Sequence, residues 1–228
     1  MSALRAIRPL AALGAAVLLL MGGATVANAE EPAEDTTPPV ITWVVPETEG
    51  AKYYYGSVPI FSCTAYDAVD GEVPCDVGLH FVNVGHHSAT AYATDTSGNT
   101  ATSERTFEVL PWTLSGFSQP VRMGEQVYNT VKGGATVPLK FEVFAGETAV
   151  TGAWAVASVV VTSVSCTDPT VEYGNVAFTS TGGTAGRSDG TAGRFIRNWQ
   201  TPTEPGTCYR VTVTTQDFSQ LSALFALK

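Results

Sequence analysis

Charged residues and long apolar runs are both scarce in this 228-residue sequence. Only 14% of the residues are charged, and the 21 acids outnumber the 12 lysines and arginines. This acidic balance disfavours contact with the phosphates of nucleic acids and with anionic lipid surfaces. After Met21, no apolar stretch approaches the roughly 20 residues that a membrane-spanning helix needs. We therefore expect no nucleic-acid partner and no membrane insertion of the processed chain.

Catalytic signatures are also missing. The sequence contains no G-x-S-x-G nucleophile elbow, no H-E-x-x-H zinc motif and no phosphate-binding loop. Any pair of carboxylates for glycoside hydrolysis would be an arbitrary choice in so acidic a chain. The adjacent His86 and His87 would point to opposite faces of a strand, which disfavours a zinc site. The sequence thus predicts a protein that is not an enzyme and carries no cofactor.

The N-terminus has the three parts of a secretory signal. Two arginines precede an uncharged apolar run at residues 10–21, and Ala27 and Ala29 place small residues before the acidic Glu30. This order predicts cleavage after Ala29, because a signal peptidase reads small residues at these two positions. A membrane anchor is the alternative, but the apolar run is shorter than a membrane span. We expect residues 1–29 to be removed and the product to be secreted, extracellular or loosely associated with the cell envelope.

The four cysteines all lie in the predicted mature chain. None belongs to a C-x-x-C pair, which disfavours zinc binding and thioredoxin-like redox chemistry. An even number of cysteines in an exported protein suggests disulfides. Of the three possible pairings, the spacing favours Cys63–Cys75 and Cys166–Cys208.

Short alternating runs dominate the mature chain, and helical periodicity is nearly absent. Residues 30–39 are acidic and proline-rich and are expected to form a flexible leader. Turn-forming clusters then recur at the interval of about 8–12 residues that is typical of all-β sandwiches. A boundary near residues 110–111 divides the chain into modules at 40–110 and 112–228. The expected strands are residues 40–45, 58–65, 79–84, 87–94, 100–109, 114–117, 127–131, 135–144, 157–165, 176–178, 194–200, 208–214 and 222–227.

The first half resembles the immunoglobulin-like modules of bacterial extracellular proteins. Residues 35–41 (DTTPPVI) match their D-x-T-P-P-x-I opening, and residues 93–101 (ATDTSGNTA) match the A-x-D-x-x-G-N-x-A hairpin near their end. The resemblance covers about residues 35–110. It implies an immunoglobulin-like β-sandwich and does not specify a ligand.

The second half is similar to the PxKF domain, which is named after the signature found here at residues 138–141 (PLKF). Further matching segments stand in order at residues 115–117 (SGF), 120–121 (PV), 129–134 (NTVKGG), 206–209 (GTCY) and 223–227 (ALFAL). The resemblance covers about residues 112–228. It implies a β-sandwich of secreted, especially actinobacterial, proteins, often placed after immunoglobulin-like modules. The expected fold is therefore all-β, with two immunoglobulin-like β-sandwich modules in tandem after the signal peptide.

Three successive tyrosines, Tyr53, Tyr54 and Tyr55, are the main candidates for ligand contact. Side chains alternate across a strand, so the three cannot all face a core. At least one is expected to be exposed unless the segment is a packed loop. Stacking of exposed tyrosines, together with Trp112, on a saccharide or a partner protein is an alternative to simple packing. Lys140, in contrast, is expected to lie on a solvated face, and Trp199 to pack in the core.

Oxygen-bearing side chains near the predicted turns raise a calcium alternative. Asp67, Asp70, Asp95 and Asn99 offer the hard oxygen ligands that calcium prefers. Asp and Asn are also ordinary turn residues, and the sequence has no D-x-D-x-D-G loop with a distal Glu. The main expectation is therefore no metal, with calcium at these four residues as the alternative.

These features predict a non-catalytic extracellular protein that mediates adhesion, surface association or scaffolding through immunoglobulin-like modules. One alternative is a carbohydrate-binding module that uses exposed tyrosine and tryptophan. Another is a tandem stiffened by calcium. In each case the expected partner is an extracellular protein or a polysaccharide.

Overall fold

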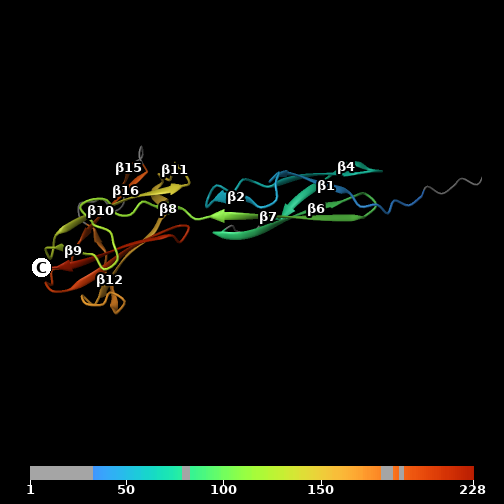
Figure 1. The fold of residues 1–228 in the computed structure, drawn as a ribbon. Coiled ribbons are helices and arrows are strands. Elements are labelled where there is room, and N and C mark those ends of the chain that lie inside the picture. The colour runs from blue at the N-terminus through green and yellow to red at the C-terminus, as the bar shows by residue number, and fades with distance from the viewer. Residues whose placement is uncertain (1–32, 79–82, 181–186, 190–192) are drawn as a thin grey trace, which may run out of the picture. The chain divides into compact units, whose positions relative to one another are not determined.

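A computed structural model describes residues 33–78, 83–180, 187–189 and 193–228 (Figure 1). The predicted signal sequence and its cleavage positions Ala27, Ala29 and Glu30 lie outside the described residues, as does most of the expected strand at 79–84. Strands form nearly all of the regular structure, and the single helical turn in the described part is η1 (Ala153–Ala155). No helix among these residues is long and apolar enough to cross a membrane.

The strands up to Leu110 form a first sandwich of two sheets. One sheet has the order β1-β3-β4 and the other the order β2-β7-β6-β5. Buried side chains of both sheets, including Trp43, Phe107 and Val109, fill the space between them. The strands are β1 (Val40–Val45), β2 (Ala51–Tyr54), β3 (Ser62–Asp67), β4 (Gly71–Val73), β5 (Cys75–Gly78), β6 (Gly85–Thr94) and β7 (Thr100–Leu110).

The strands from Thr113 onward form a second sandwich with a larger core. One sheet has the order β11-β10-β16-β14, with β8 also paired to β10 and β15 to β16, and the other has the order β13-β12-β17-β18-β9. The strands are β8 (Thr113–Leu114), β9 (Tyr128–Val131), β10 (Thr136–Ala145), β11 (Thr148–Ala149), β12 (Val156–Val164), β13 (Glu172–Val176), β14 (Thr179–Ser180), β15 (Arg187–Asp189), β16 (Arg194–Gln200), β17 (Cys208–Thr215) and β18 (Gln220–Leu227).

Alternation along β10 shows how the sequence builds this second core. Leu139 and Phe141 are fully buried, whereas Lys140 between them lies on the outer face and is partly exposed. Phe141 stacks on Phe195 of β16 with ring centroids 5.4 Å apart. Trp199 is also fully buried, with its ring edge-to-face against Phe225. The predicted placements of Lys140 and Trp199 are both confirmed.

Each sandwich pairs an early strand in parallel with its last strand. β2 runs parallel to β7, with Ala51 opposite Phe107, and β9 runs parallel to β18, with Tyr128 opposite Leu224. All other pairings in the described sheets are antiparallel. Two packed sheets of mostly antiparallel strands are the architecture of immunoglobulin-like modules. The expected all-β fold of immunoglobulin-like sandwiches is confirmed.

One disulfide lies in each sandwich. Cys63 of β3 is bonded to Cys75 of β5, and these strands belong to the two different sheets of the first sandwich. Cys166, just after β12, is bonded to Cys208 at the start of β17. The predicted pairing is therefore confirmed. The Cα atoms are 5.8 and 5.2 Å apart, within the usual range for disulfides.

Candidate metal centre

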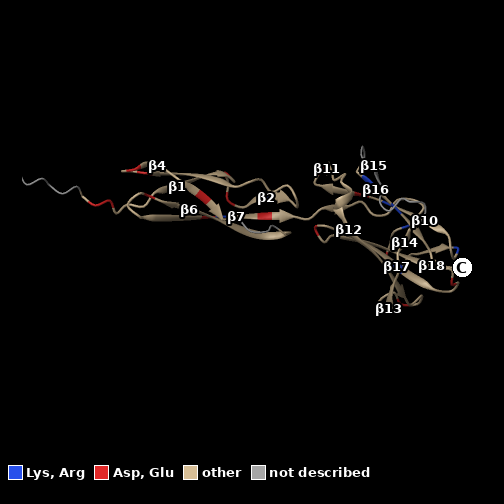
Figure 2. Ribbon diagram, turned by 180° about the vertical axis from the view of Figure 1, so that it is seen from behind, with Lys and Arg blue, Asp and Glu red and all other residues tan. Residues whose placement is uncertain are grey.

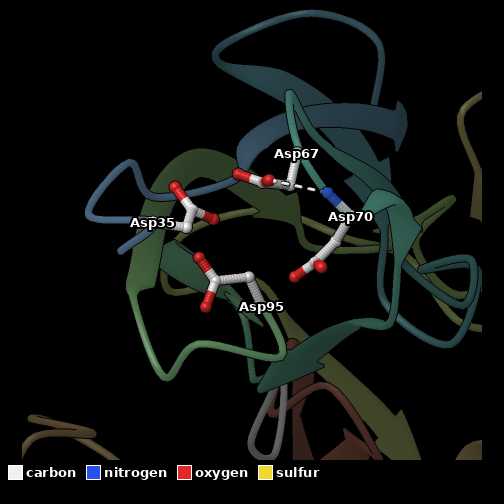
Figure 3. Close-up of side chains that lie close together, drawn as sticks. All are labelled: Asp35, Asp67, Asp70 and Asp95. Carbon is white, nitrogen blue, oxygen red and sulfur yellow. Dashed lines mark hydrogen bonds between the residues drawn. The ribbon is translucent and has the colours of Figure 1, made fainter. Parts of the chain in front are cut away.

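Four aspartates from three separate segments converge at one end of the first sandwich (Figure 3). Asp35 precedes β1, Asp67 ends β3, Asp70 lies in the turn before β4, and Asp95 follows β6. One carboxylate oxygen from each residue lies within 4.8 Å of those from the other three. The pairing of β1 with β3 and of β5 with β6 brings these distant segments to the same place.

Asp67 is the most deeply buried member, with 1% of its surface exposed. Its Oδ1 accepts hydrogen bonds from the backbone N–H groups of Val69 (2.8 Å) and Asp70 (3.1 Å), which shape the turn. These bonds, that of Asp70 first, lower the pKa of Asp67 and keep it ionised, although burial opposes them. Its Oδ2 is buried and has no hydrogen-bond partner. Buried polar atoms are rarely left unpaired, so this oxygen is a candidate for binding a cation.

In Asp35, as in Asp67, one carboxylate oxygen accepts hydrogen bonds and the other has none. Its Oδ1 accepts hydrogen bonds from the backbone N–H of Thr37 (3.0 Å) and from the Thr37 hydroxyl (2.7 Å). Its Oδ2 is buried and has no partner. Both aspartates are thus oriented by one oxygen while the other is left available within the cluster.

Asp95 and Asp70 are oriented by the turn after β6. The two oxygens of Asp95 accept hydrogen bonds from the backbone N–H of Asn99 (2.7 Å) and from its side-chain amide (2.8 Å). Asp70 accepts hydrogen bonds from the backbone N–H of Thr96 (2.7 Å) and from its hydroxyl. The cluster therefore has carboxylates held by the backbone rather than free to swing apart.

No lysine or arginine among the described residues forms an ion pair with this cluster. The shortage of positive charge extends through the first sandwich, where residues 35–110 contain ten acids and only Lys52 and Arg105 as bases. The second sandwich, residues 111–228, has eight of each, and its bases can be followed as blue segments in Figure 2. Four like charges held together without a cation repel one another. A bound metal ion would relieve that repulsion.

The donor set fits calcium better than the other common ions. Calcium takes oxygen ligands at about 2.3–2.6 Å, so two ligands on opposite sides of it lie roughly 5 Å apart. The four carboxylate oxygens, one from each aspartate, lie within 4.8 Å of one another and so fit this span. Magnesium binds at about 2.1 Å and normally uses only one or two carboxylates, and zinc favours nitrogen and sulfur ligands. The four oxygens leave further positions on calcium for water or backbone carbonyls.

The structure brings together three of the four residues that the sequence offered for calcium, namely Asp67, Asp70 and Asp95. Asn99 lies beside them, but its amide nitrogen donates to Asp95 and to the backbone oxygen of Asp35 (3.1 Å). Asn99 therefore positions two members instead of presenting its oxygen. Sequence reasoning missed Asp35, although it stands first in the DTTPP segment that carries the family resemblance.

The carbohydrate-binding alternative needs an exposed row of Tyr53, Tyr54, Tyr55 and Trp112, and the structure shows these side chains buried or half-buried. Tyr53 packs among Phe61 and Phe107 in the first core, because the parallel pairing of β2 with β7 turns it inward. Trp112 is 4% exposed, and its indole N–H donates to the backbone oxygen of Tyr55 (3.0 Å). Tyr55 places its ring edge-on against Trp112, and both Tyr54 and Tyr55 are half-buried. These four residues do not form a flat surface for a saccharide.

No protein-family model matches this chain, and no curated protein matches it. Several solved structures are remotely similar to this chain, among them the following three. The insect immune protein hemolin is 12% identical with a TM-score of 0.28, over 87% of this chain and 48% of its own. A titin immunoglobulin tandem is 12% identical with a TM-score of 0.26, over 83% and 95%. The Bacteroides ovatus protein SGBP-B, in complex with a mixed-linkage heptasaccharide, is 11% identical with a TM-score of 0.22, over 84% and 48%.

The chain spans about half the length of the hemolin and SGBP-B chains that it matches. All three TM-scores are far below 0.5.

Proposed function

We propose that the first sandwich binds one calcium ion through Asp35, Asp67, Asp70 and Asp95. The observation that supports this most directly is the pair of buried carboxylate oxygens, Asp35 Oδ2 and Asp67 Oδ2, that have no hydrogen-bond partner. An acidic cluster alone is common on protein surfaces. A buried carboxylate with one oxygen fixed and the other unpaired among three more acids is favourable only when its charge is compensated, and a bound cation would provide that compensation.

The ion would join three parts of the chain that no disulfide links. Asp35 belongs to the segment before β1, Asp67 and Asp70 to the β3–β4 turn, and Asp95 to the turn after β6. Within the described residues, the side-chain amide of Asn99 donates a hydrogen bond from the turn after β6 to the backbone oxygen of Asp35. Calcium would therefore stiffen the end of the sandwich that carries the segment before β1.

In the whole protein, we propose a non-catalytic extracellular role in adhesion, surface association or scaffolding. Two disulfides are consistent with an oxidising location outside the cytoplasm. The proposed secretion signal and the resemblance of the second module to the PxKF domain support this role. Affinity capture of extracellular proteins and polysaccharides with the mature chain tests it, and turnover in a hydrolase panel that one acidic substitution abolishes would contradict it.

Direct titration tests the calcium site. Residues 30–228, stripped with a chelator, are titrated with CaCl₂ by isothermal calorimetry, and we expect one site per chain. Asp67→Asn is expected to weaken binding at least tenfold, because it replaces the deepest ligand with a neutral one of similar shape. Asp76→Asn is the matched control, since Asp76 is an exposed acid of β5 outside the cluster.

Magnesium should bind more weakly than calcium in the same titration. An absence of binding at 10 mM calcium would overturn the proposal. So would an equal loss of affinity in the Asp67→Asn and Asp76→Asn variants.

A further inference from the structure

A hollow of about 310 Å³ opens in the second sandwich between β9, the start of β10 and the loop that contains Val121. Most of the residues that line it belong to the segments that carry the sequence signature of this half, at 120–121, 129–132 and 137–138. The calcium site uses none of them. Signature segments that are far apart in the sequence thus line the same hollow. Packing of the core does not by itself require this.

The floor of the hollow is apolar. Val121, Val137 and Phe225 reach it, and each of them is at most 5% exposed. Its volume lies at the small end of the range of about 300–1,000 Å³ that is usual for small-molecule sites. This suits a small ligand with an apolar part better than a macromolecule.

The rim of the hollow is basic. Arg122 and Lys132 are its only ionisable side chains, and neither forms an ion pair with any described residue. No acid lines the hollow, although acids outnumber bases by 21 to 12 in the whole sequence. Two bases that form no ion pair favour an anionic ligand group.

The backbone that carries Arg122 is fixed in place. Asn129 accepts a hydrogen bond from the Arg122 N–H (2.8 Å) and donates one to its carbonyl oxygen (3.0 Å). Asn129 is itself buried and also donates to the backbone oxygen of Leu224 in β18 (3.0 Å). Because this backbone is already ordered, ligand binding has a smaller entropic cost.

We infer that this hollow binds a small amphipathic molecule with one carboxylate and a short hydrocarbon part. The carboxylate lies between Arg122 and Lys132, and the hydrocarbon part covers Val121, Val137 and Phe225. This site is independent of calcium binding in the first sandwich.

The test uses octanoate as the probe and residues 30–228 in a calcium-free buffer. Binding is followed by the chemical shifts of backbone amides around the hollow. Octanoate should shift the amides of Thr130 and Val137 in a saturable way, and octanol, which lacks the charge, should bind at least tenfold more weakly. The double variant Arg122→Gln/Lys132→Gln should bind octanoate at least tenfold more weakly than the parent chain.

Lys140→Gln is the matched control, because Lys140 belongs to the same signature but does not line the hollow. It should bind octanoate as the parent does. Equal binding of octanoate and octanol would overturn the inference, as would unchanged binding in the double variant or no saturable shift at all. Equal binding of inorganic sulfate would also overturn it, because the apolar floor would then contribute nothing.

Discussion

Removing calcium should lower the melting temperature of the first sandwich by several degrees. Calcium sites in extracellular modules typically have dissociation constants of about 10⁻⁴–10⁻³ M. At 10 mM calcium such a site stabilises the folded state by about 1.4–2.7 kcal/mol. The sandwich has roughly 75 residues, and 1 kcal/mol corresponds to about 4–8 °C in a domain of this size. The expected difference between calcium and chelator is therefore about 6–20 °C.

Differential scanning calorimetry of residues 30–228 measures this difference, and the second sandwich provides an internal reference. Asp67→Asn should abolish most of the shift, whereas Asp76→Asn should leave it intact. Asp70→Asn should reduce the shift without lowering the melting temperature in chelator, because it removes one of four mutually repelling charges. A shift below about 2 °C in a chain that demonstrably binds calcium would refute the idea that the ion fastens the three segments together.

Three further predictions concern stability. Hydrogen bonds hold the pKa of Asp67 in the folded protein below its ordinary value of 3.8. The ionised carboxylate therefore stabilises the fold above pH 3.8, and this stabilisation is lost as the pH falls through the pKa of the folded state. In chelator, the melting temperature between pH 5 and 2 should fall more steeply in the parent than in Asp67→Asn. Replacing Cys166 and Cys208 by alanine opens a link across 42 positions and should cost about 4 kcal/mol in urea unfolding, and an unchanged midpoint would contradict this. Leu139→Ala should cost about 2–5 kcal/mol in the same assay, whereas Lys140→Ala should stay within about 0.5 kcal/mol because its side chain lies on the outer face.

The strands that the sequence predicted best are those with strong local alternation. The structure has β1 at Val40–Val45 and β16 at Arg194–Gln200, as expected. The sequence did not predict β2 at Ala51–Tyr54, because that strand is defined by parallel pairing with β7, more than fifty residues later. The same non-local pairing decides which way Tyr53 points. Alternation alone shows that successive side chains face opposite sides, but not which side is the core.

The metal centre illustrates the same limit. Asp67, Asp70 and Asp95 could be selected because each lies in or next to a turn and carries an oxygen ligand. Asp35 could not be selected on that basis, since its distance to the others is set by the sheet and not by sequence spacing. The unpaired oxygens of Asp35 and Asp67 are visible only when every hydrogen bond in the neighbourhood is known.

The parallel strands have a consequence for a protein that is pulled between two attachments. In the second sandwich, β9 precedes the core strands and β18 follows them, and they are joined over four residue pairs from Tyr128–Leu224 to Val131–Leu227. Tension that reaches the start of β9 and the end of β18 would draw these parallel neighbours in opposite directions along their length. The hydrogen bonds between them would then be loaded together in shear, and not opened one at a time. The four pairs of β2 with β7 have the same orientation in the first sandwich. Each sandwich thus contains one parallel strand pair whose hydrogen bonds would resist extension in shear.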